Sequence, residues 1–94
     1  MKKPRTPFPT TPGEMLEEEF LKPLNMSQAD LARKLKIQPR AINEICRGRR
    51  RVTPRIAFLF ADAFNTTPEV WMNMQMACDL WKEWERLTKK KKVS

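Results

Sequence analysis

Residues 28–47 read QADLARKLKIQPRAINEICR, and this pattern predicts two helices joined by a tight turn at Lys36 and Ile37. Such helices can cross steeply only where the crossing point is small, and Ala32 places a small side chain in the middle of the first helix. Lys36 stands where such turns usually have glycine, because that residue ends the helix in the left-handed region, so we expect a cost on the order of 1 kcal/mol and a looser turn. The apolar residues that must face inward are Leu31, Leu35, Ile37, Ile42 and Ile45.

The second helix of this pair has an apolar face and a polar face. Ile42, Ile45 and Cys46 point towards the core, and the polar residues follow at i, i+3, i+4 and i+7 on the other side: Arg40, Asn43, Glu44 and Arg47. Arginine can donate two hydrogen bonds to guanine, asparagine can pair with both edge groups of adenine, and glutamate can accept from cytosine. The arginines at the end of the helix suit the flanking phosphates, and these are Arg47, Arg49, Arg50 and Arg51.

The alternative for this polar face is an ordinary solvated helix surface. The charge distribution favours a polyanion site instead, because residues 33–55 carry +8 of net charge while residues 14–32 carry −4 and residues 56–88 carry −3. A basic band between acidic flanks is typical of proteins that bind nucleic acid. We therefore expect double-stranded DNA as the partner.

The rest of the chain predicts further helices and no strands. Thr11-Pro12-Gly13-Glu14 resembles a capping box that starts a helix over 15–21, Ser27 and Asp30 cap the helix that follows, and helices also start at Thr53-Pro54 and Thr67-Pro68. No segment alternates with period two, so the fold class is all-α with five helices, the last running to about Leu87. We expect a flexible basic arm over 1–10, one domain over 11–88 and a basic tail over 89–94.

Composition argues against several classes of function. No apolar run reaches the length of a membrane span and no signal peptide pattern opens the chain, so we expect a cytoplasmic, nucleoid-associated protein. Cys46 and Cys78 fit reduced core thiols, and without histidine neither a cysteine–histidine zinc site nor a histidine acid/base pair can form. We therefore expect no metal, no cofactor and no enzymatic activity.

The fifth helix carries two apolar stripes. The first holds Val70, Met74, Ala77, Cys78 and Trp81, and we expect it to pack on the core. The second is expected to form a symmetric homodimer contact and comprises Met72, Met76, Leu80 and Trp84. The alternative is that both stripes are core. A twofold dimer predicts a palindromic operator with half-sites about one helical turn apart.

Residues 27–45, SQADLARKLKIQPRAINEI, resemble the helix-turn-helix of the phage-repressor-like superfamily, which is also called the XRE or Cro/C1 type and has a λ-repressor-like fold. The wider pattern over residues 11–84 resembles HigA-type antitoxins, which are sometimes grouped with virulence-associated protein I. Its most discriminating part is the ending T-x-E-x-W-x-N-x-Q, which spans residues 67–75. The departures from the pattern are Lys36, and Met72 and Met74 where leucine is commoner.

The resemblance implies two roles. Such antitoxins neutralise a HigB-type toxin, a RelE-like ribonuclease that cleaves mRNA on the ribosome, and as dimers they repress their own operon. By position, Gln28 would contact phosphate, while Gln38, Arg40 and Asn43, with Glu44 as a weaker candidate, would contact bases. Two alternatives stay open: a stand-alone transcriptional regulator without a toxin, and a protein-interaction module that binds RNA. The tryptophans lie in the fifth helix, away from the arginines. The basic segment therefore has no aromatic side chains on which RNA bases could stack, which argues against RNA binding.

Overall fold

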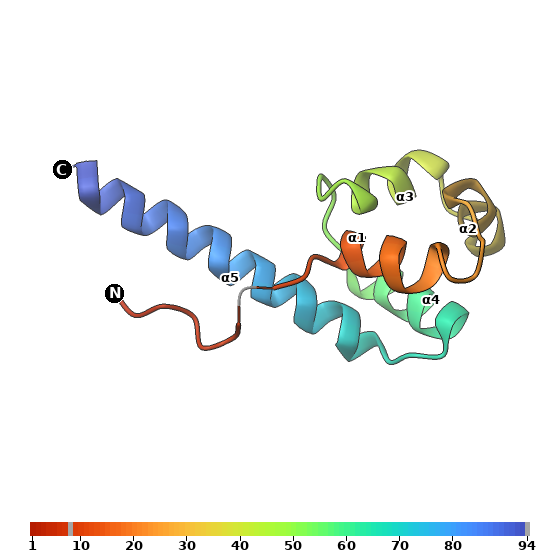
Figure 1. Ribbon diagram of the computed structural model, residues 1–94, viewed down its shortest axis with the longest axis horizontal. Coiled ribbons are helices and arrows are strands. Elements are labelled where there is room, and N and C mark those ends of the chain that lie inside the picture. The colour runs from red at the N-terminus through yellow and green to blue at the C-terminus, as the bar shows by residue number, and fades with distance from the viewer. Residues whose placement is uncertain (8, 94) are drawn as a thin grey trace.

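The computed structural model describes residues 1–7 and 9–93, with side chains up to Lys89, and within that part the chain is helical with no strand, as predicted. Phe8 in the predicted arm and Ser94 in the predicted tail lie outside the described residues. Figure 1 shows the helices packed around one another, with the last one extending away from the rest. The elements are α1 (Pro12–Met15), η1 (Leu16–Leu21), α2 (Gln28–Leu35), α3 (Pro39–Cys46), α4 (Pro54–Phe64) and α5 (Pro68–Val93).

Capping hydrogen bonds confirm the helix starts predicted at Thr11, Ser27 and Thr53. The Thr11 hydroxyl accepts from the Glu14 amide at 3.1 Å, which begins α1. At α2 the capping box is reciprocal, because the Asp30 amide donates to the Ser27 hydroxyl at 2.9 Å and the Ser27 amide donates to the Asp30 carboxylate at 3.1 Å. The first predicted helix is more irregular than expected, since its second half, η1, is a π-helix.

The turn between α2 and α3 closes without the looseness expected from Lys36. Lys36 adopts the predicted left-handed conformation, with φ 56° and ψ 44°. Its amide donates to the Arg33 carbonyl at 3.3 Å, and the Ile37 amide donates to the Ala32 carbonyl at 2.9 Å. These are the two hydrogen bonds of a Schellman motif. The turn is therefore closed, even though a left-handed backbone at a residue other than glycine costs free energy.

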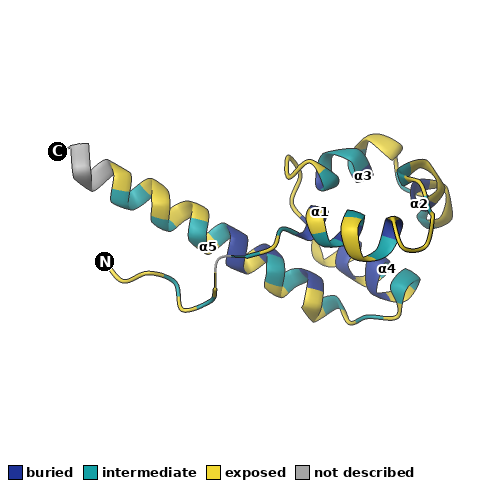
Figure 2. Cartoon of the chain, in the orientation of Figure 1, coloured by how far each residue is buried: buried dark blue, intermediate teal, exposed yellow. Residues whose placement is uncertain are grey.

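The core lies where α1, η1, α2, α3 and α4 meet the first half of α5 (Figure 2). Trp71 is its largest fully buried side chain, and its ring centroid lies 5.0 Å from that of Phe60. The Trp71 indole N–H donates to the Thr66 hydroxyl at 2.8 Å, so its polar edge is satisfied. The prediction that Val70 packs on the core is wrong, because Val70 is 37% exposed.

The far half of α5 leaves the body of the domain. The molecule measures 49 × 23 × 23 Å with a radius of gyration of 14.9 Å, whereas a compact chain of this length would have about 12 Å. The helix continues to Val93 and does not end near Leu87, so residues 89–93 of the predicted tail are its last turns. None of the helices described is both long and apolar enough to cross a membrane.

The N-terminal segment has no regular secondary structure and lies against α5 (Figure 1). The Trp81 indole N–H donates to the Thr6 carbonyl at 3.0 Å. The Lys3 ammonium lies 5.7 Å from the centre of a Trp84 ring, within range of a cation–π contact. The segment therefore covers part of the aromatic surface of α5.

Candidate nucleic-acid interface

The polar face of α3 is presented to solvent because its apolar face is held in the core. Ile42 and Ile45 are fully buried against the other helices. Pro39 occupies the first turn, where its missing N–H costs nothing, and Gln38 precedes it as the N-cap. On the opposite face Arg40 has a side chain that is 86% exposed, and Gln38 and Arg47 are also exposed. Three of the predicted contact residues are thus free to meet a ligand.

Glu44 lies among arginines. Its Oε1 accepts from Arg50 at 2.7 and 3.0 Å, and its Oε2 lies 3.6 Å from the Arg40 guanidinium. The hydrogen bond from Arg50 is the main cause that lowers the pKa of Glu44 below its usual value. In this arrangement Glu44 orients two cations, which is a different role from the base contact expected for it.

Asn43 belongs to a hydrogen-bonded chain that crosses three helices. Its Nδ2 donates to Gln28 Oε1 at 3.0 Å, and Gln28 Nε2 donates to Glu17 Oε1 at 2.5 Å. Gln28 and Asn43 were both predicted to contact DNA, whereas Glu17 was missed. The sequence gives no local signal for Glu17, because it lies eleven residues from Gln28 and meets it only through the packing of η1 on α2.

A basic hollow of about 640 Å³ lies beside the start of α3. Gln38 and Arg40 line it together with Arg50 from the loop after α3. Two cations missed by the prediction, Lys36 and Arg55, complete its wall. Arg55 follows Pro54 at the start of α4, within the basic band of residues 33–55, and that band was the available signal for it.

The predicted phosphate-binding arginines divide into two sets. Arg47 and Arg49 are exposed and form no ion pair with the side chains that the structure describes, whereas Arg50 pairs with Glu44 and Arg51 pairs with Asp79 of α5 at 2.7 Å. Arg51 is thereby turned towards α5. The structure brings Arg50, Arg40 and Gln38 together in the basic hollow, and it brings Arg49, Arg50 and Arg51 together in a second hollow beside α5 that Arg47 does not line.

The loop after α3 is fastened to α5 by Gln75, the last residue of the T-x-E-x-W-x-N-x-Q ending. Gln75 is buried, and its Oε1 accepts from the Val52 amide at 2.8 Å while its Nε2 donates to Asp79 at 3.0 Å. Because Asp79 also holds Arg51, the motif acts as a clamp between the loop and the helix.

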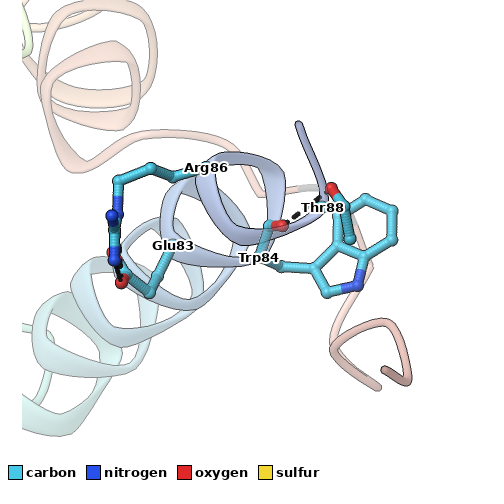
Figure 3. A network of polar contacts seen from close by, with 4 residues as sticks. All are labelled: Glu83, Trp84, Arg86 and Thr88. Atoms are coloured by element: carbon cyan, nitrogen blue, oxygen red, sulfur yellow. Dashed lines mark hydrogen bonds and ion pairs between the residues drawn. The ribbon is translucent and has the colours of Figure 1, made fainter. Parts of the chain in front are cut away.

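The predicted dimer stripe is only partly exposed. Met76 and Leu80 are 50% and 47% exposed, but Met72 packs against the core and Trp84 is half-buried. Figure 3 shows the Trp84 ring on one side of α5 and the Glu83–Arg86 ion pair on the other. In the part of the chain described, no three acidic, cysteine or histidine side chains gather as metal ligands.

Comparison with known proteins places this geometry in a family. The helix-turn-helix family model matches residues 18–71. An uncharacterised HTH-type transcriptional regulator of Haemophilus influenzae is 42% identical over 78% of this chain and 68% of its own length. Antitoxin HigA-1 of Vibrio cholerae is 36% identical over 78% of this chain and 69% of its own length.

A solved structure shows the same fold. Pseudomonas aeruginosa antitoxin HigA, determined with the higBA promoter, superposes with a TM-score of 0.82 at 34% identity, covering 87% of this chain and 89% of that one. The match therefore includes most of α5 as well as the helix-turn-helix. With more than half of its length matched by the family model, this chain belongs to the helix-turn-helix family of the XRE type and is similar to HigA antitoxins over most of its length.

Proposed function

We propose that this protein is the antitoxin of a type II toxin–antitoxin system, which binds operator DNA to repress its own operon and neutralises a HigB/RelE-like mRNA-cleaving toxin. The observation that carries the proposal is the exposed polar face of α3, with Arg40 beside the basic hollow. The likeness to an antitoxin solved with promoter DNA supports it. In this role the protein acts by binding, in the cytoplasm and on the nucleoid.

The proposed DNA contact places α3 in the major groove. Arg40 and Asn43 then face base edges, while Arg47, Arg49 and Arg55 lie towards the phosphates on either side. Arg50 and Glu44 form an ion pair that holds Arg40 near the groove. Because phosphate contacts release counterions, we expect a steep fall of affinity with salt.

A selection from a randomised duplex library, followed by titration of the selected site, tests this contact. If Arg40 pairs with a guanine, Arg40→Ala lowers affinity by about 1–3 kcal/mol and relaxes specificity at one position. Arg86→Ala, which removes the same charge from far along α5, is the matched control and leaves the specificity unchanged. A protein that selects no sequence at modest salt would refute the DNA part of the proposal.

The proposed dimer uses an exposed strip near the middle of α5, with Met76 and Leu80 at the contact. These side chains lie one turn apart on α5, and they are 50% and 47% exposed. Trp84 lies one turn further on, and Met72 is the member of the predicted stripe that the core already engages. Light scattering after size-exclusion chromatography tests this: Leu80→Glu yields a monomer, whereas Val70→Glu, at an exposed site near the start of α5, does not.

The toxin part is tested by co-expression with the product of the neighbouring gene. Co-purification and relief of growth inhibition support an antitoxin, and their absence refutes this part alone. The second candidate is a stand-alone regulator, which the name of the Haemophilus influenzae relative favours. Under that candidate the gene has no toxin-sized neighbour, while the selection experiment still returns a palindromic operator.

A further inference from the structure

The side chains of Glu17, Gln28 and Asn43 form a relay from η1 through the start of α2 to the polar face of α3. The two links measure 2.5 Å and 3.0 Å, and all three side chains are partly buried. The Cys46 thiol also hydrogen-bonds to Glu17. Burial and this hydrogen bond raise the pKa of the thiol, so the thiol stays protonated. Every member of the relay therefore has a partner inside the domain.

The direction of the relay follows from the chemistry of its first member. A carboxylate only accepts hydrogen bonds, whereas an amide has one end that donates and one that accepts. Glu17 therefore requires the NH2 group of Gln28, which leaves the Gln28 oxygen facing α3. That oxygen in turn requires the NH2 group of Asn43. One acceptor at the base of the relay thus sets the orientation of both amides.

This orientation determines what Asn43 offers to a ligand. One of its two Nδ2 protons is used by Gln28, and its Oδ1 together with the second proton remains available. An acceptor beside a donor matches the N6 donor and N7 acceptor of adenine in the major groove, and it matches no other single base edge in the same way. A flipped amide would present these groups in the reverse order.

We propose that Glu17 is a positioning residue that makes Asn43 select adenine at one position of the operator. The inference rests on the proposed DNA-binding function and adds a specificity determinant outside the helix-turn-helix itself. Glu17 touches no DNA in this role. It acts by holding the Asn43 amide in one orientation before binding, which removes the ordering cost that a free side chain would carry.

The test is a randomised-duplex selection with the full-length protein and four variants. Asn43→Ala identifies the position at which the adenine preference depends on this side chain. Glu17→Ala then reduces the adenine preference at that position by about tenfold, because a good bidentate pair discriminates by about 1–3 kcal/mol. Glu17→Gln retains most of the preference, since its amide oxygen can still accept from Gln28. Glu19→Ala removes the same charge from an exposed site on η1 and leaves the base preference unchanged.

The outcomes separate this inference from the proposed function. If the wild-type protein selects no sequence, both are overturned. If it selects an operator but Glu17→Ala keeps the full adenine preference at the Asn43 position, or Glu17→Gln loses it as completely as Glu17→Ala, the relay is overturned and DNA binding stands. Side-chain amide NMR gives a second measurement on the free protein: the Gln28 and Asn43 NH2 signals are shifted by hydrogen bonding in the wild type. Unshifted signals would overturn the relay even if Glu17→Ala failed to fold.

Discussion

Gly13 of α1 packs directly against the backbone of α3, so a single added methyl group should disturb the contact between these two helices. A Cβ atom added there would lie 2.2 Å from the Ile45 carbonyl oxygen and 2.8 Å from the Cys46 Cα. Both are backbone atoms of the last turn of α3, so no side-chain rotation can relieve the clash. Gly13→Ala must therefore push α1 and α3 apart.

The size of the effect can be worked from these distances. Carbon–oxygen contacts are comfortable at about 3.3 Å or more, so the two helices must separate by roughly 1 Å. Overpacking of this kind costs about 1–3 kcal/mol, and rigid backbone on both sides favours the upper part of that range. At an exposed helical site, replacing glycine by alanine would raise the free energy of unfolding by about 1 kcal/mol. A fall in place of a rise would therefore show that the site is tightly packed. Subtracting that gain from the overpacking cost, we expect a net loss of about 1–2 kcal/mol and a fall in Tm of about 4–16 °C.

Urea and thermal unfolding followed by circular dichroism measure this change in the free energy of unfolding. Gly48→Ala is the matched control, because Gly48 has φ +73° but nothing within 4 Å of an added Cβ. It loses only about 1 kcal/mol, from the left-handed backbone. A Gly13→Ala protein that is as stable as the wild type, or more stable than Gly48→Ala, would show that the α1–α3 contact is not as tight as described.

Three further predictions concern the Gln75 clamp, the half-buried thiol of Cys46 and the basic hollow. Gln75→Ala leaves the Val52 amide buried without its acceptor and lowers the free energy of unfolding by about 1–3 kcal/mol, read from the urea midpoint. Burial raises the pKa of Cys46 to about 12 from 9.0. In a variant whose other cysteine, Cys78, is replaced, a thiol reagent at pH 8 should therefore react with the folded protein about a thousandfold more slowly than with the unfolded protein. Because that pKa is raised in the folded state, the stability linked to it is complete below pH 9 and is lost as pH rises towards 12. Arg55→Ala reduces the salt slope of DNA binding by about 1 in a filter or fluorescence titration, whereas Arg33→Ala on α2 does not.

Local chemistry explains which parts of the fold could be predicted from the sequence. Thr11, Ser27 and Thr53 each cap a helix through a backbone amide three residues away, so the signal and the structure lie in the same short segment. Lys36 was predicted to be left-handed for the same reason. The inward-facing positions of α2 and α3 followed from helical periodicity alone, and Leu31 and Ile42 are indeed fully buried.

Val70 is the error in the predicted core stripe of α5. The core residue at the start of the helix is its neighbour Trp71, about 100° further round, whereas Ala77 and Cys78 are buried as expected. The helix is anchored at its start by Trp71 and Gln75, and the second of these is polar. A pattern based on apolar residues could not assign a buried glutamine to the core, because its partner, the Val52 amide, is far away in sequence.

The candidate site was predicted in composition but not in arrangement. Arg40 and Asn43 lie on the expected face, yet the Asn43 amide is oriented by Glu17 and the cations of the basic hollow include Arg55. Arg51 was grouped with its neighbours because they share a charge, and it does line one hollow with Arg49 and Arg50, but its ion pair with Asp79 of α5 was not predicted. Contacts between residues far apart in the chain decided each of these details.

The same long-range contacts join the proposed dimer helix to the proposed DNA-binding surface. The loop that follows α3 is held by Gln75 and Asp79, and Met76 and Leu80 follow each of these by one residue on α5. A partner that binds Met76 and Leu80 therefore contacts the same turns of α5 that position the loop. Since a twofold dimer sets the distance between its two recognition helices, this clamp makes the spacing of the half-sites a property of α5 rather than of the helix-turn-helix. Loosening it by Gln75→Ala should broaden the spacing that a selection returns, while the bases preferred within each half-site stay the same.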